Sequence, residues 1–183
     1  MQLPQIETAR LRLLPYTLDD LDDLHRLWTD PDVRRYLFDN KVIAREQAAS
    51  GIERSLACFQ THGFGEWAVC LRGKDPLIGF CGFRFTGDPP EVELFYGLAP
   101  AHWGQGLTTE AARAILRYGF EEHKFSCVVA SADAPNVASL RVMEKVGMRF
   151  DKRVGKGGLD LVYYRVSREA FQSDDSYYRV YRA

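Results

Sequence analysis

Apolar residues recur along this chain with two periods, and each period predicts one type of element. An apolar residue at every third or fourth position from Leu18 to Trp28 predicts a helix that begins after a capping Thr17. Four aspartates within residues 19–23 suit the positive end of that helix, and an acidic substrate-binding face is the alternative interpretation. Further elements are predicted as a helix over residues 45–61 and strands over residues 8–15, 66–71, 77–85 and 91–98.

After Pro100 the two periods alternate. The predicted order is helix 106–121, strand 125–131, helix 136–146, strand 148–154 and strand 159–167. Gly73-Lys74-Asp75-Pro76 predicts a tight hairpin that pairs strands 66–71 and 77–85 antiparallel, and Gly155-Lys156-Gly157-Gly158 predicts another turn. The fold class is therefore α/β (α+β), a mixed sheet with helices packed on it.

Length and composition indicate one globular unit. The chain has 183 residues, of which 46% are hydrophobic, and domains average roughly 150 residues. No repeat or low-complexity linker divides the chain, so residues 8–172 are expected to form one domain and residues 173–183 a C-terminal tail. The tail segment Tyr177-Tyr178-Arg179-Val180-Tyr181 could serve as an interaction module, which is the weakest functional hypothesis.

Charge and cysteine usage exclude several classes of function. The net charge is -1, so nucleic acid and anionic membrane are not expected partners. The chain has neither a leader pattern nor an apolar run of roughly 20 residues, which predicts a cytoplasmic protein. The four cysteines, Cys58, Cys70, Cys81 and Cys127, lack metal-ligand spacing, so no metal site is expected. The last three lie in apolar, strand-like runs and are expected to be buried thiols.

The segment from Gly104 to Thr109 is the first candidate site. A strand ends near Leu98, a loop with two glycines follows, and a helix begins near Gly106. The backbone N–H groups of residues 104–109 are then the unpaired donors of a helix N-terminus, and glycines let an anion approach them. A pyrophosphate fits this description, although glycines before a helix also serve ordinary turns. The segment lacks the third glycine of a dinucleotide fingerprint.

Several marks along the chain together identify a resemblance to a known family. The chain resembles the GNAT superfamily of acetyl-coenzyme A dependent N-acetyltransferases, most closely the branch of ribosomal-protein alanine N-acetyltransferases, from residue 7 to about residue 172. The marks that carry it are Glu7-Thr8-x-Arg10-Leu11-x-Leu13, Glu93-Leu94-x-Tyr96, Trp103-Gly104-x-Gly106-x-x-x-Glu110-Ala111, Asn136-x-x-Ser139, Glu144-Lys145-x-Gly147 and Tyr163-Tyr164-x-Val166-x-Arg168-Glu169.

The resemblance implies a single-domain GNAT fold: a mixed, mostly antiparallel sheet of six or seven strands, flanked by helices, whose central strands splay apart around the arm of acetyl-coenzyme A. It implies that the coenzyme contacts Leu98, Trp103, Gly104, Gln105, Gly106, Leu107, Thr108, Thr109, Asn136 and Ser139. Thr108 departs from the broad pattern, which has Gly or Ala there. Asn136 is also placed as an ordinary helix N-cap, and one residue can do both.

Acetyl transfer to an amine requires a proton acceptor, because an alkyl ammonium titrates near ~10.4. Glu93 is the first candidate for this base and Glu91 the second, with a structural ion pair as the alternative role of Glu93. Strand alternation is expected to place Glu91, Glu93 and Phe95 on one face and Leu94, Tyr96 and Leu98 on the other. A backbone N–H between Tyr96 and Leu98 is the expected oxyanion donor.

The leaving thiolate requires a donor, and the family's tyrosine, seven residues after Asn136, is replaced by Met143. Ser139 is the donor that this branch implies, with a purely structural first-turn serine as the alternative. The acceptor is an amine on a protein N-terminus or a small molecule, transferred to directly in a ternary complex. A catalytically inactive or regulatory coenzyme-binding protein is the alternative function, and a homodimer is compatible with the sequence.

Overall fold

Nine strands form one continuous sheet in the computed structural model of the chain, which describes residues 2–74, 76–156 and 158–182. The strand order across the sheet is β7-β8-β6-β5-β4-β3-β2-β1-β9. Neighbouring strands pair antiparallel except β5 and β6, which are parallel. The strands are β1 (Pro4–Thr8), β2 (Leu11–Pro15), β3 (Glu66–Leu71), β4 (Leu77–Thr86), β5 (Glu91–Leu98), β6 (Cys127–Asp133), β7 (Arg149–Lys156), β8 (Leu159–Ser167) and β9 (Tyr178–Arg182).

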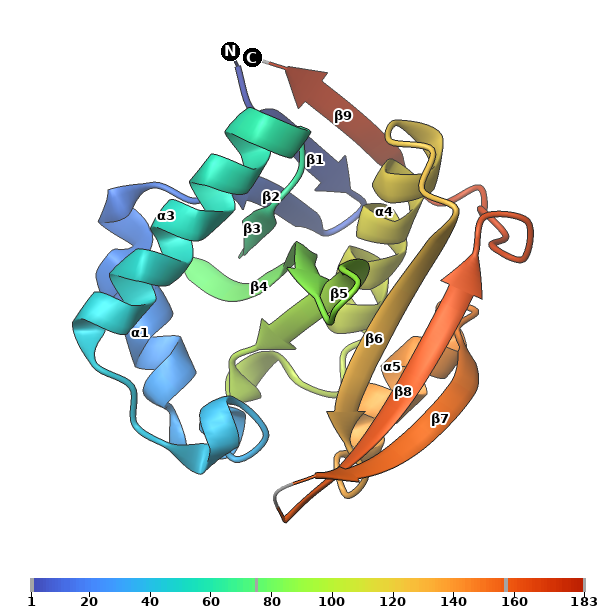
Figure 1. Cartoon of the computed structure of the whole chain (residues 1–183). Helices are drawn as coiled ribbons and strands as arrows, with labels where there is room; N and C mark the ends of the chain where they lie inside the picture. The colour runs from blue at the N-terminus through green and yellow to red at the C-terminus, as the bar shows by residue number, and fades with distance from the viewer. Residues whose placement is uncertain (1, 75, 157, 183) are drawn as a thin grey trace.

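Helices cover both faces of this sheet (Figure 1). The α-helices are α1 (Leu21–Thr29), α2 (Pro31–Arg34), α3 (Arg45–His62), α4 (Leu107–Glu121) and α5 (Val137–Lys145). Three short 3-10 turns are η1 (Leu18–Asp20), η2 (Phe38–Asn40) and η3 (Pro100–His102). The helix predicted after Thr17 is therefore split into η1 and α1, with the backbone N–H of Thr17 donating to Asp20 Oδ2 at 2.7 Å. The other predicted helices and strands from residue 45 to residue 167 are present, with end shifts of a few residues.

The fold class is confirmed, but the sheet has more strands than the six or seven expected. The strand predicted over residues 8–15 is present as β2, and residues 4–8 form an additional strand, β1, which turns into β2 at Ala9 and Arg10. That turn contains neither Gly nor Pro, so the sequence carries no turn signal there. The other additional strand, β9, comes from the tail segment, and it pairs with β1 along the whole of Pro4–Thr8. Figure 1 accordingly shows the two chain ends side by side.

The core has two layers, one on each face of the sheet. Leu94, Leu98 and Ile115 belong to the larger cluster, under α4 and α5. Trp28 and Phe80 belong to the smaller cluster, under α1 and α3, and Phe95 packs against it. The alternation expected along β5 is therefore confirmed, because Leu94 and Leu98 face one layer and Phe95 the other.

Some expectations concern smaller features. Cys70 and Cys81 are buried thiols, whereas Cys127 is only half-buried. The two predicted hairpin turns include residues 75 and 157, which lie outside the described residues. Across the described ranges, no helix combines the length and apolar character that a membrane crossing needs. In the same ranges, no group of three or more His, Cys, Asp or Glu side chains is gathered as a set of metal ligands.

Candidate active site

The central strands β5 and β6 separate soon after they meet. Within the described residues their one register pair is Glu93 with Val129, and beyond it the strands diverge (Figure 1). The edge of β5 that faces away from β6 stays paired with β4 to the end of the strand. There the backbone N–H of Ala99 donates to the carbonyl of Ile78 at 2.8 Å. Because amide direction alternates along a strand, the N–H groups of residues 96 and 98 point away from β4 and toward the gap.

A cavity of about 410 Å³ opens at this gap. Its lining comes from the end of β5, the loop before α4, the first turns of α4 and α5, and the α2 region. The residues predicted from sequence for coenzyme binding or catalysis all lie in this lining except Gln105 and Glu93; those that line it are Leu98, Trp103, Gly104, Gly106, Leu107, Thr108, Thr109, Asn136 and Ser139. The indole Nε1 of Trp103 donates to the Leu98 carbonyl at 2.7 Å, which ties the loop to the end of β5.

The loop before α4 exposes backbone donors to this cavity. Gly104 and Gly106 have φ of 74° and 75°, a left-handed conformation that other residues adopt only with strain. A Cβ at Gly104 would meet no atom within 4 Å, so this side of the loop is open. The first backbone bond of α4 runs from the N–H of Glu110 to the carbonyl of Gly106 at 3.0 Å. The N–H groups of residues 107–109 therefore precede the first helical hydrogen bond and are available to an anion.

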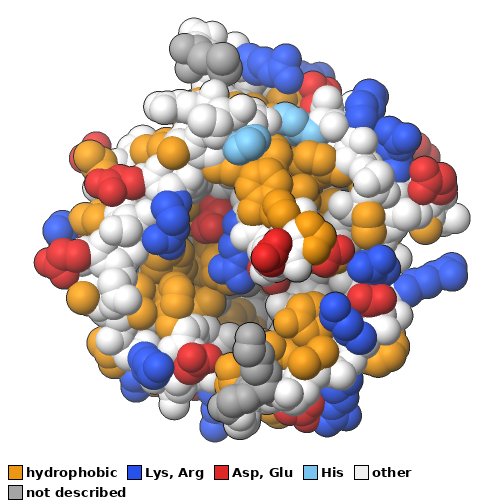
Figure 2. Space-filling model, in the orientation of Figure 1, with side chains coloured by type: hydrophobic (Ala, Val, Ile, Leu, Met, Phe, Trp, Pro, Cys, Tyr) orange, Lys and Arg blue, Asp and Glu red, His pale blue; other side chains and the backbone are white. Residues whose placement is uncertain are grey.

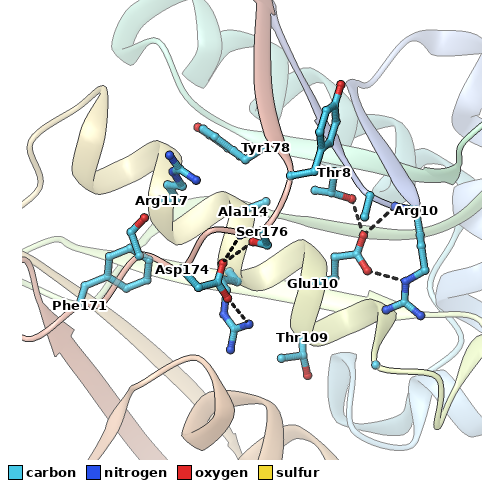
Figure 3. A pocket seen from close by; sticks show the side chains of 15 residues that line it. Thr8, Arg10, Thr109, Glu110, Ala114, Arg117, Phe171, Asp174, Ser176 and Tyr178 are labelled. Carbon is cyan, nitrogen blue, oxygen red and sulfur yellow. Dashed lines mark hydrogen bonds and ion pairs between the residues drawn. The ribbon is translucent and has the colours of Figure 1, made fainter.

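The same loop is fastened from behind by a latch of three side chains, Thr8, Arg10 and Glu110 (Figure 3). Glu110 Oε1 accepts from Thr8 Oγ1 at 2.6 Å and from the N–H of Arg10 at 2.9 Å, and Glu110 Oε2 accepts from Arg10 Nε at 2.6 Å. Burial alone would raise the pKa of Glu110, but these bonds from Thr8 and Arg10 hold it below its ordinary value. Arg10 Nη1 also donates to the Gln105 carbonyl at 2.9 Å, so the latch holds the loop itself.

Gln105 turns away from the cavity. Its side-chain Nε2 donates to the carbonyl of Ala101 at 3.2 Å, back along the loop. Only its backbone can therefore contribute to the anion-binding side of the loop.

The start of α5 and the end of β5 bring two hydroxyl groups together at the gap. Asn136 caps this helix, because its Oδ1 accepts from the N–H of Ser139 at 3.2 Å. Tyr96 Oη donates to the Ser139 carbonyl at 3.0 Å and lies 2.9 Å from Ser139 Oγ. Burial raises the pKa of Tyr96 well above its ordinary value, with a smaller opposing effect of the bond to Ser139. Tyr96 is thus a protonated hydrogen-bond donor at neutral pH.

Four positions change what the sequence alone implied. Met143, which stands where the family has a tyrosine, is 1% exposed and belongs to the core under α4 and α5. Tyr96, on the opposite side of the gap, brings a phenol hydroxyl beside Ser139 instead. Arg141 and Lys145 also line the cavity, and the sequence analysis missed them. Their spacing of four residues on the helix after Asn136 was the available signal, because it places both cations on one helix face.

Glu93 lies on the other face of the sheet, under the groove beside α1 and α3. It is 4% exposed, its Oε2 accepts from Arg84 Nε at 2.7 Å, and its Oε1 accepts from Ser131 Oγ at 2.8 Å. The Arg84 guanidinium is stacked 3.7 Å from the centre of the Phe95 ring. We call this set, Arg84, Glu93, Phe95 and Ser131, the acceptor-face cluster.

The fallback residue Glu91 is exposed and forms an ion pair with Arg165 at 3.3 Å. Figure 2 shows this face of the molecule hollowed near its middle, with hydrophobic side chains on the flanks and charged side chains inside. The two faces of β5 thus carry different chemistry: hydroxyls and amides toward the cavity, and charged groups toward the groove.

Comparisons with known proteins agree with this geometry. A family model described as an acetyltransferase (GNAT) domain matches residues 10–149. YkkB, an uncharacterised protein of Bacillus subtilis, is 32% identical over 165 residues, covering 87% of this chain and 94% of its own.

Solved structures show the same architecture. A GNAT-family acetyltransferase from Bacillus anthracis superposes with a TM-score of 0.77 at 27% identity, covering 90% of this chain and 99% of that chain. RimL, a ribosomal L7/L12 alpha-N-protein acetyltransferase in complex with coenzyme A, has a TM-score of 0.74 at 16% identity over 89% of this chain and 97% of that chain. At that identity the likeness to RimL concerns the fold alone.

Proposed function

The chain belongs to the GNAT family of acetyltransferases, and from that premise we propose that it acetylates a primary amine by direct attack on acetyl-coenzyme A within a ternary complex. The family's enzymes take the acetyl group from acetyl-coenzyme A, so the donor follows from family membership. The direct attack and the site residues are supported by the gap between β5 and β6. The cavity at this gap is lined both by the glycine loop before α4, with its free amides, and by Tyr96 and Ser139, whose hydroxyls are paired.

The residues around the cavity fit coenzyme A, whose thioester supplies the activated acetyl group. The amides of residues 104–109 would receive the pyrophosphate, aided by the α4 dipole, which contributes roughly 0.3 to 1 kcal/mol. Arg141 and Lys145 add two cations on the same side. The amides of residues 96 and 98 and the side chain of Asn136 would bind the amide-containing arm as it passes between the strands.

Within the gap, two groups act on the reacting thioester. One of the β5 amides that point into the gap would donate to the carbonyl oxygen as negative charge develops there. The Ser139 and Tyr96 hydroxyls would donate to the departing sulfur. A thiol titrates near ~8.5, so a thiolate leaves without a strong acid and a hydroxyl pair is a sufficient donor.

The attacking amine enters from the opposite face. At neutral pH it arrives as an ammonium and must lose a proton before its lone pair can attack. A carboxylate of the acceptor face would take this proton, directly or through water. Glu93 is the candidate from sequence, and its neighbours Arg84 and Ser131 are the groups that would orient its carboxylate.

The acceptor class is open between a protein N-terminus and a small amine, so the test covers both. The purified protein is incubated with acetyl-coenzyme A and a panel of an N-terminal peptide, a polyamine, an aminoglycoside and an arylalkyl amine. Thiol release and the mass gain of one acetyl group on the amine are measured. Turnover on at least one amine supports the proposal. Tight coenzyme binding with no turnover on any amine would favour a regulatory coenzyme-binding protein.

A further inference from the structure

A second carboxylate, that of Glu66, lies beside the acceptor-face cluster and has no part in the mechanism so far. Glu66 begins β3 and stands directly opposite Gly82 of β4, which in turn stands opposite Phe95 of β5. Two residues beyond Gly82 on the same face is Arg84. Glu66 and Glu93 therefore lie on the two strands that flank β4, on the face that carries Arg84, and the charge of Arg84 acts on Glu66.

The backbone of Glu66 is fixed, and the residue as a whole is not fully covered. Its N–H donates to Ser55 Oγ at 2.8 Å, and Ser55 Oγ donates to its carbonyl at 3.0 Å, so α3 holds the first residue of β3 at both polar groups. The residue is only partly buried, whereas Glu93 is almost fully covered. A group that must exchange a proton with substrate or water needs this access.

The carboxylate of Glu93 is fixed by hydrogen bonds at both ends. Both oxygens of Glu93 accept short bonds, one from Arg84 and one from Ser131. Bonds from a cation and a hydroxyl hold a carboxylate in place, which suits a residue that positions Arg84.

The electrostatic surroundings of Glu66 suit the opposite role. Burial raises the pKa of Glu66 to about 7, against the lowering effects of Arg84 and Arg54 and with a further rise from Glu93. A base is most effective when its pKa lies close to the working pH. The titratable and charged groups that interact with it come from every neighbouring element: Tyr16 before η1, Arg54 and Cys58 on α3, Cys81 and Arg84 on β4, and Glu93 on β5.

We propose that Glu66 is the proton acceptor for the attacking amine and that Glu93 is a positioning residue, which holds Arg84 between the two carboxylates. The inference rests on the proposed function. One proton passes from the ammonium nitrogen to a Glu66 oxygen, directly or through water, which frees the nitrogen lone pair. The new N–C bond forms as the C–S bond breaks, and the sulfur keeps that electron pair. The second nitrogen proton reaches the sulfur through the Ser139 and Tyr96 hydroxyls, and Glu66 returns its proton to solvent.

The test compares the pH dependence of kcat/KM for Glu66→Gln, Glu66→Asp and Glu93→Gln, using whichever panel amine the wild-type protein acetylates. The wild-type profile is expected to rise through a midpoint near pH 7. Glu66→Gln should lower the rate about a hundredfold at pH 7, lose this limb, and recover as the pH approaches that of amine deprotonation. Glu66→Asp should restore part of the limb. Glu93→Gln should keep the limb and lower the rate at every pH.

Controls separate the two hypotheses. Glu53→Gln, at an exposed glutamate of α3, removes one carboxylate from the helix that packs against Glu66 and should leave the profile unchanged. Coenzyme A affinity and thermal melting of each variant establish that it is folded. If the wild-type protein acetylates no amine, the proposed function fails. If it is active and the limb persists in Glu66→Gln, or disappears in Glu93→Gln alone, Glu66 is not the proton acceptor and this inference is overturned.

Discussion

The hydroxyls of Tyr96 and Ser139 come from β5 and α5 and meet at the point where the two central strands part. Their separation of 2.9 Å makes them one polar unit, in which a proton on one oxygen can be passed to the other. The carbonyl of Ser139 fixes the phenol as well. At this scale, the phenol that stands beside Ser139 comes from β5, while position 143 of α5 carries a buried methionine.

We therefore expect Ser139→Ala and Tyr96→Phe each to lower kcat by about ten- to a hundredfold, below the range of strong general acids because the thiolate leaves easily. The double variant should lose little more than either single one, since both residues serve the same proton. Coenzyme A affinity, measured by calorimetry, should change much less than kcat. Equal losses of affinity and kcat would instead indicate that the pair only holds the coenzyme.

The raised pKa of Glu66 also predicts how stability depends on pH. Burial raises the pKa of Glu66 to about 7 in the folded protein, whereas an unfolded glutamate titrates near ~4.3. The folded state then binds the proton more tightly, so the stabilising contribution is complete below the unfolded value and is lost as the pH rises through about 7. The free energy of unfolding is measured with urea at pH 5 and at pH 8. From pH 5 to pH 8 it should fall by about 1–3 kcal/mol more in the wild-type protein than in Glu66→Gln. A constant difference between the two proteins would contradict the shift.

At the scale of elements, the first turn of α4 works only if the loop before it is held open. The free amides of residues 107–109 follow from helix geometry, but their direction depends on two left-handed glycines. The latch joins that turn to the β1–β2 hairpin, since Arg10 contacts both Glu110 and the Gln105 carbonyl. The β1–β2 hairpin thereby helps to hold the shape of the loop before α4.

Breaking the latch should weaken coenzyme binding without removing a coenzyme contact. Glu110→Gln and Arg10→Ala are each expected to raise the dissociation constant of coenzyme A about ten- to a hundredfold, because bonds to charged groups contribute roughly 1.5–3 kcal/mol. Glu121→Gln is the matched control: it removes a glutamate from the same helix whose partner Arg117 lies far along the helix from the loop. Calorimetry with coenzyme A measures all three. Unchanged affinity in both latch variants would show that the loop keeps its shape unaided.

The sequence predicts much of this element-level picture, for local reasons. The helix predicted over residues 106–121 and strand 91–98 follow from periodicity, and the loop before the helix follows from glycines, which are typical of turns. Pairs such as Glu110 with Arg10, or Glu93 with Arg84, join strands and helices whose register no local pattern encodes. The contact of Ser139 with Tyr96 also joins two distant elements. The sequence therefore predicts which residues belong to the site, but it does not predict which of them contact each other.

At the scale of the whole molecule, the sheet is closed at one side by the last strand of the chain. β9 pairs with β1 from Pro4 to Thr8, and the Tyr177 hydroxyl donates to Glu7 at 3.0 Å. Asp174 adds an ion pair with Arg113 of α4 at 2.7 Å. The short alternating tail gave no hint of its partner, because β1 lies more than 150 residues away in the sequence. Residues 178–182, which the sequence predicts as part of a C-terminal tail, therefore form the edge strand of the sheet that carries the site.

Deleting residues 177–183 should accordingly lower thermal stability while leaving coenzyme A affinity nearly unchanged. Loss of the β9 ladder exposes the β1 backbone edge, and at about 2–4 °C per kcal/mol for a chain of this size we expect the melting temperature to fall on the order of 5–10 °C. The free edge should also promote pairing between copies, visible as a larger species in light scattering. Arg182→Ala is the control, because it removes the exposed Arg182 side chain and its ion pair with Glu122 but leaves the β9 backbone in place, and it should shift melting by no more than a few degrees. If the deletion variant melts at the same temperature as the full chain, β9 contributes nothing to the stability of the fold. If the deletion variant loses coenzyme A affinity while Arg182→Ala does not, the edge of the sheet is coupled to the loop before α4 through Glu7, Thr8 and the latch.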